Sequence, residues 1–209
     1  MLSSAGKSLA FLSLAAALGC ATLRPIETDQ PVELGHNEGI LLIDVASNVP
    51  INRLYVNPTT PLEDFPAGRT LRLVAAPAGS YRWWKLSFPN GMGYRMLRHD
   101  YWEFRVEPGR ISYPGMLMVH SSPVAHLTGD IGVQSLNRSA LSYKMLEEAF
   151  PGIAERYPVV YTGRARDEFL IRFQELRRAL RATGEAGAPA DAEAGHATPT
   201  VESATGHEP

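Results

Sequence analysis

The chain has 209 residues, with 20 basic and 22 acidic side chains and a formal net charge of −2 at pH 7. Hydrophobic residues make up 44% of it and charged residues 20%, which is enough apolar material for a packed core and excludes a chain that is disordered throughout. The near-neutral charge offers no broad basic surface, so we expect no nucleic-acid partner. The single cysteine excludes a disulfide framework and a cysteine-based zinc site.

The first residues have the pattern of a secretory signal peptide. Lys7 precedes the largely apolar run 9–18, and Gly19 and Cys20 follow. A basic start, a short apolar segment and small residues at a cleavage point are the parts of such a signal. A membrane-spanning helix needs about 20 apolar residues, so this run is too short to span. We therefore predict a signal peptide over residues 1–19.

Residues Ala17-Leu18-Gly19-Cys20 resemble the lipobox of bacterial lipoproteins. In that family the cysteine thiol receives a diacylglyceryl group, the signal peptide is cut before the cysteine, and the new amine is acylated with a fatty acid such as palmitate. The resemblance implies that Cys20 anchors the mature chain to a membrane. Family members retained in the inner membrane often carry Asp after the cysteine, and Ala21 stands there in this chain. The implied location is therefore the outer membrane, facing the periplasm. The alternative is a secreted protein with a cysteine at its cleavage site.

The mature chain begins with a polar segment and continues with a region of strands. Residues 20–38 are polar and contain two prolines, so we predict a tether. Residues 39–138 contain apolar or alternating runs separated by turns rich in Pro and Gly, which indicates half-buried strands. These runs are 40–45, 53–57, 70–75, 83–88, 101–107, 111–119 and 127–133. We predict an antiparallel β-sandwich of about seven strands, with a small barrel as the alternative.

The apolar spacing becomes helical beyond the predicted sandwich. Residues 141–150 have helical spacing, Pro151 ends that helix and can open a short second one, and an apolar stripe over 165–180 predicts a longer third helix. We predict a helical extension over 139–182 that packs on the sandwich. The alternative is that its arginine-rich face lies on anionic headgroups. Residues 183–209 are small and acidic, which predicts a disordered tail.

A second resemblance concerns the middle of the chain. Residues 77–83 and 104–115 are similar to strand elements of uncharacterised bacterial lipoproteins that have a small, transthyretin-like β-sandwich. Pro108-Gly109 would turn the chain between two strands. The resemblance implies a sandwich fold and no activity, because that family has no established one.

The sequence holds no pattern typical of an enzyme. It has no nucleophile elbow, no zinc-protease motif and no conspicuous carboxylate pair. The mid-chain candidates for metal binding are His99, Asp100, His120, His126 and Asp130, which we interpret as polar residues at strand ends. We therefore predict no enzymatic activity, no metal site and no cofactor.

Aromatic residues are concentrated in residues 81–104. If Trp84 and Trp102 point inward on strands, Trp83 and Tyr101 point outward, because successive side chains on a strand alternate. Exposed rings can stack on sugars or anchor a partner. The basic residues close to them in sequence are Arg82, Lys85, Arg95 and Arg98. We predict that Trp83 and Tyr101 contact a ligand or partner, and the alternative is that both are core residues.

Together these observations predict a lipid-anchored protein of the cell envelope. The expected role is a non-catalytic interaction or structural module, attached to the membrane through Cys20 and bound to another envelope protein. The alternative is a glycan-binding module that uses exposed aromatic residues near Trp83 and Tyr101.

Overall fold

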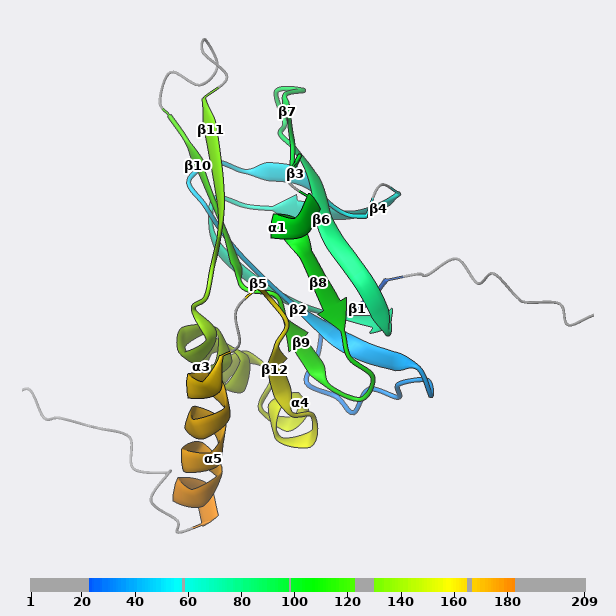
Figure 1. The fold of residues 1–209 in the computed structure, drawn as a ribbon, viewed down its shortest axis with the longest axis vertical. Coiled ribbons are helices and arrows are strands. Elements are labelled where there is room, and N and C mark those ends of the chain that lie inside the picture. The colour runs from blue at the N-terminus through cyan, green and yellow to red at the C-terminus, as the bar shows by residue number, and fades with distance from the viewer. Residues whose placement is uncertain (1–22, 58, 98, 123–129, 165–166, 183–209) are drawn as a thin grey trace, which may run out of the picture. The chain divides into compact units, whose positions relative to one another are not determined.

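Two β-sheets stack to form a sandwich (Figure 1), one with 7 strands and one with 5. The computed structural model describes residues 23–57, 59–97, 99–122, 130–164 and 167–182. The predicted signal peptide, Cys20 and the predicted tail lie outside these residues. The predicted fold class, a β-sandwich followed by helices, is confirmed.

The larger sheet contains β1 (Arg24–Ile26), β2 (Glu38–Ser47), β5 (Gly68–Pro77), β9 (Ile111–Tyr113), β10 (Met116–Ser121), β11 (Ile131–Leu136) and β12 (Val159–Tyr161). The smaller sheet contains β3 (Ile51–Val56), β4 (Thr60–Phe65), β6 (Gly79–Ser87), β7 (Gly93–Arg95) and β8 (Glu103–Val106). The helices are α1 (His99–Trp102), α3 (Ser139–Ala149), α4 (Pro151–Arg156) and α5 (Glu168–Ala182).

Strand β2 organises the larger sheet. It pairs with β5 along its whole length in antiparallel fashion, and its other edge is shared by β9 and then β10, both parallel to it. The chain bends between β9 and β10 at Gly115, whose φ is +106° and whose missing Cβ would lie 3.0 Å from the hydroxyl of Ser135. Glycine is the residue that accepts this backbone and this close approach. The larger sheet is therefore mixed, whereas the alternation of the sequence predicted antiparallel strands alone.

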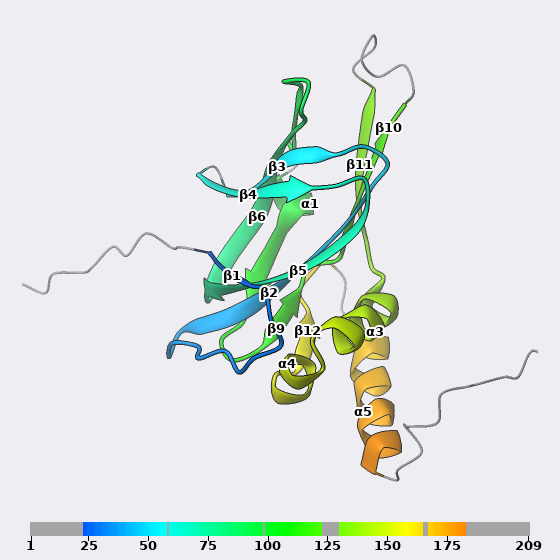
Figure 2. The same ribbon diagram turned by 180° about the vertical axis from the view of Figure 1, so that it is seen from behind.

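Strand β2 is also buried on both faces. Leu41, Ile43 and Val45 belong to the core between the two sheets, and Ile40 and Leu42 face the other way and are equally buried. Figure 2 shows α3 and α4 beside the end of this sheet where β9 and β12 lie. The buried residues outside the central core include Tyr143, Leu146, Ile153, Ala154 and Val159. A strand covered on both faces needs a continuous apolar run, which is what this stretch of the sequence has.

The predicted tether is wrong for the described residues 23–38. Strand β1 pairs with β5, and the carboxylate of Asp29 accepts hydrogen bonds from the backbone N–H groups of Gly152 and Ile153 at the start of α4. The hydroxyl of Tyr157 donates to the carbonyl of Val32. Polar composition predicted a free segment here, but an edge strand and a helix cap use backbone and carboxylate groups, which need no apolar side chains.

The predicted helical extension needs a smaller correction. Helices α3 and α4 are present, but β12 follows them and pairs with β9 in parallel, so this part of the chain also completes the larger sheet. Helix α5 lies mainly in a second compact unit, Ile171–Pro209. Phe169, a member of the predicted apolar stripe, is 61% exposed. Within the part of the chain that the structure describes, no helix combines the length and apolarity needed to cross a membrane.

Candidate functional site

The structure brings Trp83 and Tyr101 together, but in a small pocket. Both line a space of about 50 Å³ beside Trp102 and Phe104. Ligand pockets usually enclose about 300–1,000 Å³, whereas this volume suits a single water molecule. The indole nitrogen of Trp83 is buried without a hydrogen-bond partner among the described residues, which fits a bound water. Trp83 is only 2% exposed, so the predicted outward orientation is wrong.

A β-bulge explains the reversed orientation. Val56 of β3 pairs with Trp83 of β6, but the next residue of β3, Tyr55, pairs with Lys85. Trp84 is therefore an extra residue on β6, and the alternation of side chains changes phase there. Trp83 points into the core and Trp84 is partly exposed. Strict alternation counted from Trp84 correctly predicts that Leu86 and Phe88 are buried. It wrongly predicts that Trp84 is buried and Trp83 exposed.

Trp102 is buried as predicted, at 6% exposed, but it lies in the short helix α1 and not in a strand. Tyr101 is partly exposed; its ring meets Trp102 edge-on, with centroids 4.5 Å apart. The guanidinium of Arg164 lies 5.1 Å from the centroid of the Tyr101 ring. This ring therefore contacts two side chains of its own chain, Trp102 and Arg164.

The outer face of the smaller sheet gathers the aromatic and basic residues that the sequence placed near this site. We call it the basic aromatic face. Cross-strand pairing puts Tyr55 beside Lys85, Lys85 beside Arg95, and Arg82 beside Glu103. The alternate residues of these strands are buried in the core, so the members of the face point away from it. Its members are Arg53, Tyr55, Glu63, Arg82, Trp84, Lys85, Arg95, Glu103 and Arg105.

Two arginines flank Trp84 on this face. The guanidinium carbon of Arg82 lies 4.1 Å from the ring centroid of Trp84, and that of Arg95 lies 5.3 Å from it. The ammonium of Lys85 lies 5.7 Å from the centroid of Tyr55. Such cation–π contacts hold positive charge close to the aromatic surface. Arg98, the remaining basic residue predicted nearby, lies outside the described residues.

The positive charge of this face is largely unneutralised. Arg53 forms an ion pair with Glu63 at 2.9 Å. Counting described residues only, Arg82, Lys85, Arg95 and Arg105 take part in no ion pair. The face therefore presents unpaired cations next to two aromatic rings, an arrangement suited to binding anions and planar or sugar rings.

A second group of polar residues is buried under α3. Arg69 donates two hydrogen bonds to the carboxylate of Asp44, at 2.9 and 2.6 Å, and the hydroxyl of Ser142 lies 2.6 Å from the same carboxylate. The hydroxyl of Tyr113 lies 2.9 Å from that of Ser142, and burial raises the pKa of Tyr113. We call these four residues the buried polar network.

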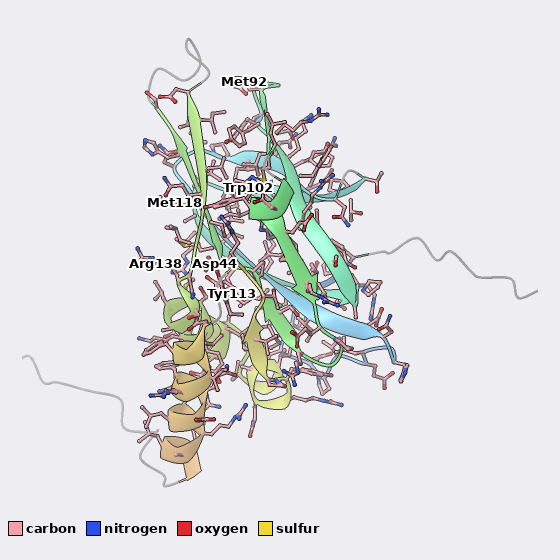
Figure 3. The ribbon with its side chains drawn as sticks, viewed as in Figure 1. Asp44, Met92, Trp102, Tyr113, Met118 and Arg138 are labelled. Carbon is pink, nitrogen blue, oxygen red and sulfur yellow. The ribbon has the colours of Figure 1, made fainter. Side chains whose placement is uncertain are left out.

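The buried polar network joins the sheet to a helix. Figure 3 shows Asp44 and Tyr113 close to one another beside α3. Asp44 lies on β2, Arg69 on β5, Tyr113 on β9 and Ser142 on α3, and all except Arg69 are at most 1% exposed. A buried carboxylate with complete hydrogen bonding fixes neighbouring elements relative to one another. Asp44, Tyr113 and Ser142 are closed to solvent and Arg69 reaches it only in part, so the network is suited to orienting α3.

A large hollow lies beside the edge strands of the two sheets. It measures about 1050 Å³ and is lined by residues of β1, β4 and β5, among them Leu62, Leu73 and Val74. Glu27 and Asp64 also line it. Groups of three or more His, Cys, Asp or Glu side chains that could hold a metal are absent from the described residues. This hollow therefore shows no chemistry beyond a mixed polar and apolar surface.

Of the three histidines considered as metal candidates, the structure describes the side chain of one, His120. His120 is exposed on β10. His126 and the side chain of His99 lie outside what is described. Asp130 is exposed at the start of the segment that leads into β11.

Comparisons with known proteins give no match, whether to a family model, a curated protein or a solved structure. The function must therefore be inferred from the residues themselves. Among these, Trp84 is the surface residue that sequence reasoning missed. The sequence pattern that marks this region is Arg82-Trp83-Trp84-Lys85, in which a basic residue stands on each side of two adjacent tryptophans.

Proposed function

We propose that this chain is a lipid-anchored module of the bacterial cell envelope that acts by binding and not by catalysis. The observation that carries the proposal is the basic aromatic face, whose unpaired cations surround Trp84. A rigid two-sheet scaffold that presents such a face is suited to recognition. The expected partner is another component of the envelope.

Anchoring through Cys20 fits the described structure. The first described residue, Leu23, leads directly into β1, which pairs with the larger sheet. An acylated Cys20 three residues earlier would hold the folded domain close to the membrane surface. The lipobox resemblance and Ala21 favour the outer membrane, with the domain facing the periplasm.

The solvent accessibility of the titratable side chains favours binding over catalysis. In the buried polar network Ser142 is 0% exposed and Asp44 is 1% exposed, so neither side chain is accessible to a substrate. A nucleophile or general base must reach a substrate. The accessible charged groups of the basic aromatic face are instead mostly cations.

A glycan is the second candidate for the ligand. The exposed tryptophan is Trp84 and not Trp83, and both lie in the region where the sequence predicts exposed rings. Trp84 and Tyr55 are both partly exposed on the outer face of the smaller sheet. Aromatic rings with polar neighbours commonly bind the apolar faces of sugars.

The proposal can be tested in living cells by cross-linking and membrane fractionation. The native chain, the Cys20→Ala variant and an Arg82→Gln/Arg95→Gln variant would be compared, with mass spectrometry to detect acylation. We expect acylated native chain in the outer membrane, a released Cys20→Ala chain, and loss of a specific cross-link in the double arginine variant. Equal solubility of the native and Cys20→Ala chains would refute the lipid anchor. A cross-link unaffected by the arginine changes would refute the binding face.

A further inference from the structure

We infer that the basic aromatic face binds an anionic glycan, a sugar chain that carries phosphate or carboxylate groups. The inference deepens the proposed function by naming the ligand of the same surface. It depends on three features of the face, which are the arrangement of its arginines, its charge relative to the whole chain, and the small number of exposed aliphatic side chains beside its aromatic rings.

The arginines at Trp84 are held in place with their donors available. Arg82 and Arg95 lie 4.1 and 5.3 Å from the ring centroid, as measured from the guanidinium carbon. A guanidinium is planar, and its N–H groups point outward in its own plane. Those donors fit phosphate and carboxylate oxygens in paired contacts. Because the ring already restricts the side chains, binding would order them at a smaller entropy cost.

The charge of the face is opposite to that of the whole chain. Its basic residues are Arg53, Arg82, Lys85, Arg95 and Arg105, and its acidic residues are Glu63 and Glu103. The full chain has a net charge of −2. Positive charge concentrated on one face of an acidic protein attracts an anionic partner to that face. The cations extend along β6 and the two strands that pair with it here, β7 and β8. This extended positive surface suits a partner with several anionic groups.

The side chains of the face favour a sugar over a lipid surface. The large hydrophobic side chains that are exposed in the described structure are Leu97, Leu141, Phe169, Ile171 and Leu176. Four of them lie outside the smaller sheet, and Leu97 follows the end of β7, two residues after Arg95, so the face has one large aliphatic side chain at its border. A surface that enters a membrane needs apolar groups to insert, whereas a sugar ring needs an aromatic platform with hydrogen-bond donors beside it. Trp84 and Tyr55 with their cations provide the second arrangement.

Binding of a defined probe to the full chain, purified in detergent, tests the inference. The probe is a glucosamine disaccharide with a phosphate at each end, and the comparison ligands are the unphosphorylated disaccharide and inorganic pyrophosphate. Titration calorimetry would be run on the native chain and on Arg82→Gln, Arg95→Gln and Trp84→Ala. The matched control is Arg110→Gln, which removes an arginine that is half exposed and paired with Glu107 outside this face.

We expect the bisphosphorylated disaccharide to bind more tightly than either comparison ligand. Each arginine variant should weaken it about ten-fold, as expected for loss of charged hydrogen bonds, while Arg110→Gln leaves it unchanged. Affinity should also fall as ionic strength rises.

Equal binding of the unphosphorylated disaccharide would overturn the requirement for anionic groups. Equal binding of pyrophosphate would overturn the requirement for a sugar. Absence of binding by all three ligands would overturn the inference as a whole. The assay does not depend on Cys20, so these results are independent of the test of membrane anchoring.

Discussion

Replacing Asp44 by Asn should destabilise the fold far more than breaking a comparable ion pair on the surface. The side chain of Asp44 is 0% exposed and receives two hydrogen bonds from Arg69 and one from Ser142. Removing one partner of a buried pair costs about 3–5 kcal/mol, because the other charge is left without compensation. The Arg69 side chain is 21% exposed and can be partly hydrated, so we expect a value near the lower limit, about 3 kcal/mol.

The control is Glu63→Gln, which removes the partner of Arg53 on the exposed face. Side chains of that pair are 47% and 55% exposed, and exposed pairs contribute about 0–1 kcal/mol. Urea denaturation followed by circular dichroism would give both free energies of unfolding. Ser142→Ala, which keeps the charge pair, should cost about 1–2 kcal/mol and remains measurable if the Asn variant does not fold. Equal losses for Asp44→Asn and Glu63→Gln would refute the view that the buried polar network holds α3 on the sheet.

Four further outcomes follow from individual contacts. Gly39→Ala places a methyl group against the backbone carbonyl of Glu107 in the β8–β9 turn and should lower the free energy of unfolding by about 1–3 kcal/mol or more, measured by urea denaturation against a wild-type reference. Asp29→Ala removes the cap of α4 and should cost about 1 kcal/mol, with faster hydrogen exchange in β1; unchanged exchange would contradict docking of that segment. Iodide should quench fluorescence more than caesium does, because cations surround Trp84, and the difference should disappear in Trp84→Phe. Burial raises the pKa of Tyr113, so the folded chain keeps a proton that the unfolded chain loses above about pH 10; stability should fall as pH rises beyond that value, and less steeply in Tyr113→Phe.

The sandwich could be predicted because its strands are separated by strong turn signals and its alternation is regular over most of their length. The sequence also located the change to helices, since the apolar spacing changes and Pro151 marks the boundary where α4 begins. The parallel pairing of β2 with β9 and β10 was not predictable. It joins segments far apart in the chain, and a local pattern carries no information on which strands become neighbours.

Polar segments were the main source of error in the domain boundaries. Residues 23–38 have few apolar side chains, and composition therefore predicted a tether. Their contacts are made by the backbone of β1, the carboxylate of Asp29 and the backbone carbonyl of Val32. Groups of this kind occur in every polar segment, so composition cannot distinguish a docked segment from a free one.

Sequence reasoning placed the exposed ring of the candidate site at Trp83, whereas the structure exposes Trp84. Alternation predicts orientation only while the register between strands is constant, and one inserted residue reverses every later position. Here the insertion falls between two adjacent tryptophans, so it exchanges their roles: Trp83 packs at 4.7 Å from the ring of Phe104, and Trp84 meets Arg82 outside. Both tryptophans lie between Arg82 and Lys85, so the neighbouring residues in the sequence do not tell which ring is exposed. The bulge places one indole in the core and the other on the basic aromatic face, and a variant that deletes Trp84 should restore regular alternation in β6 and leave the face without its indole.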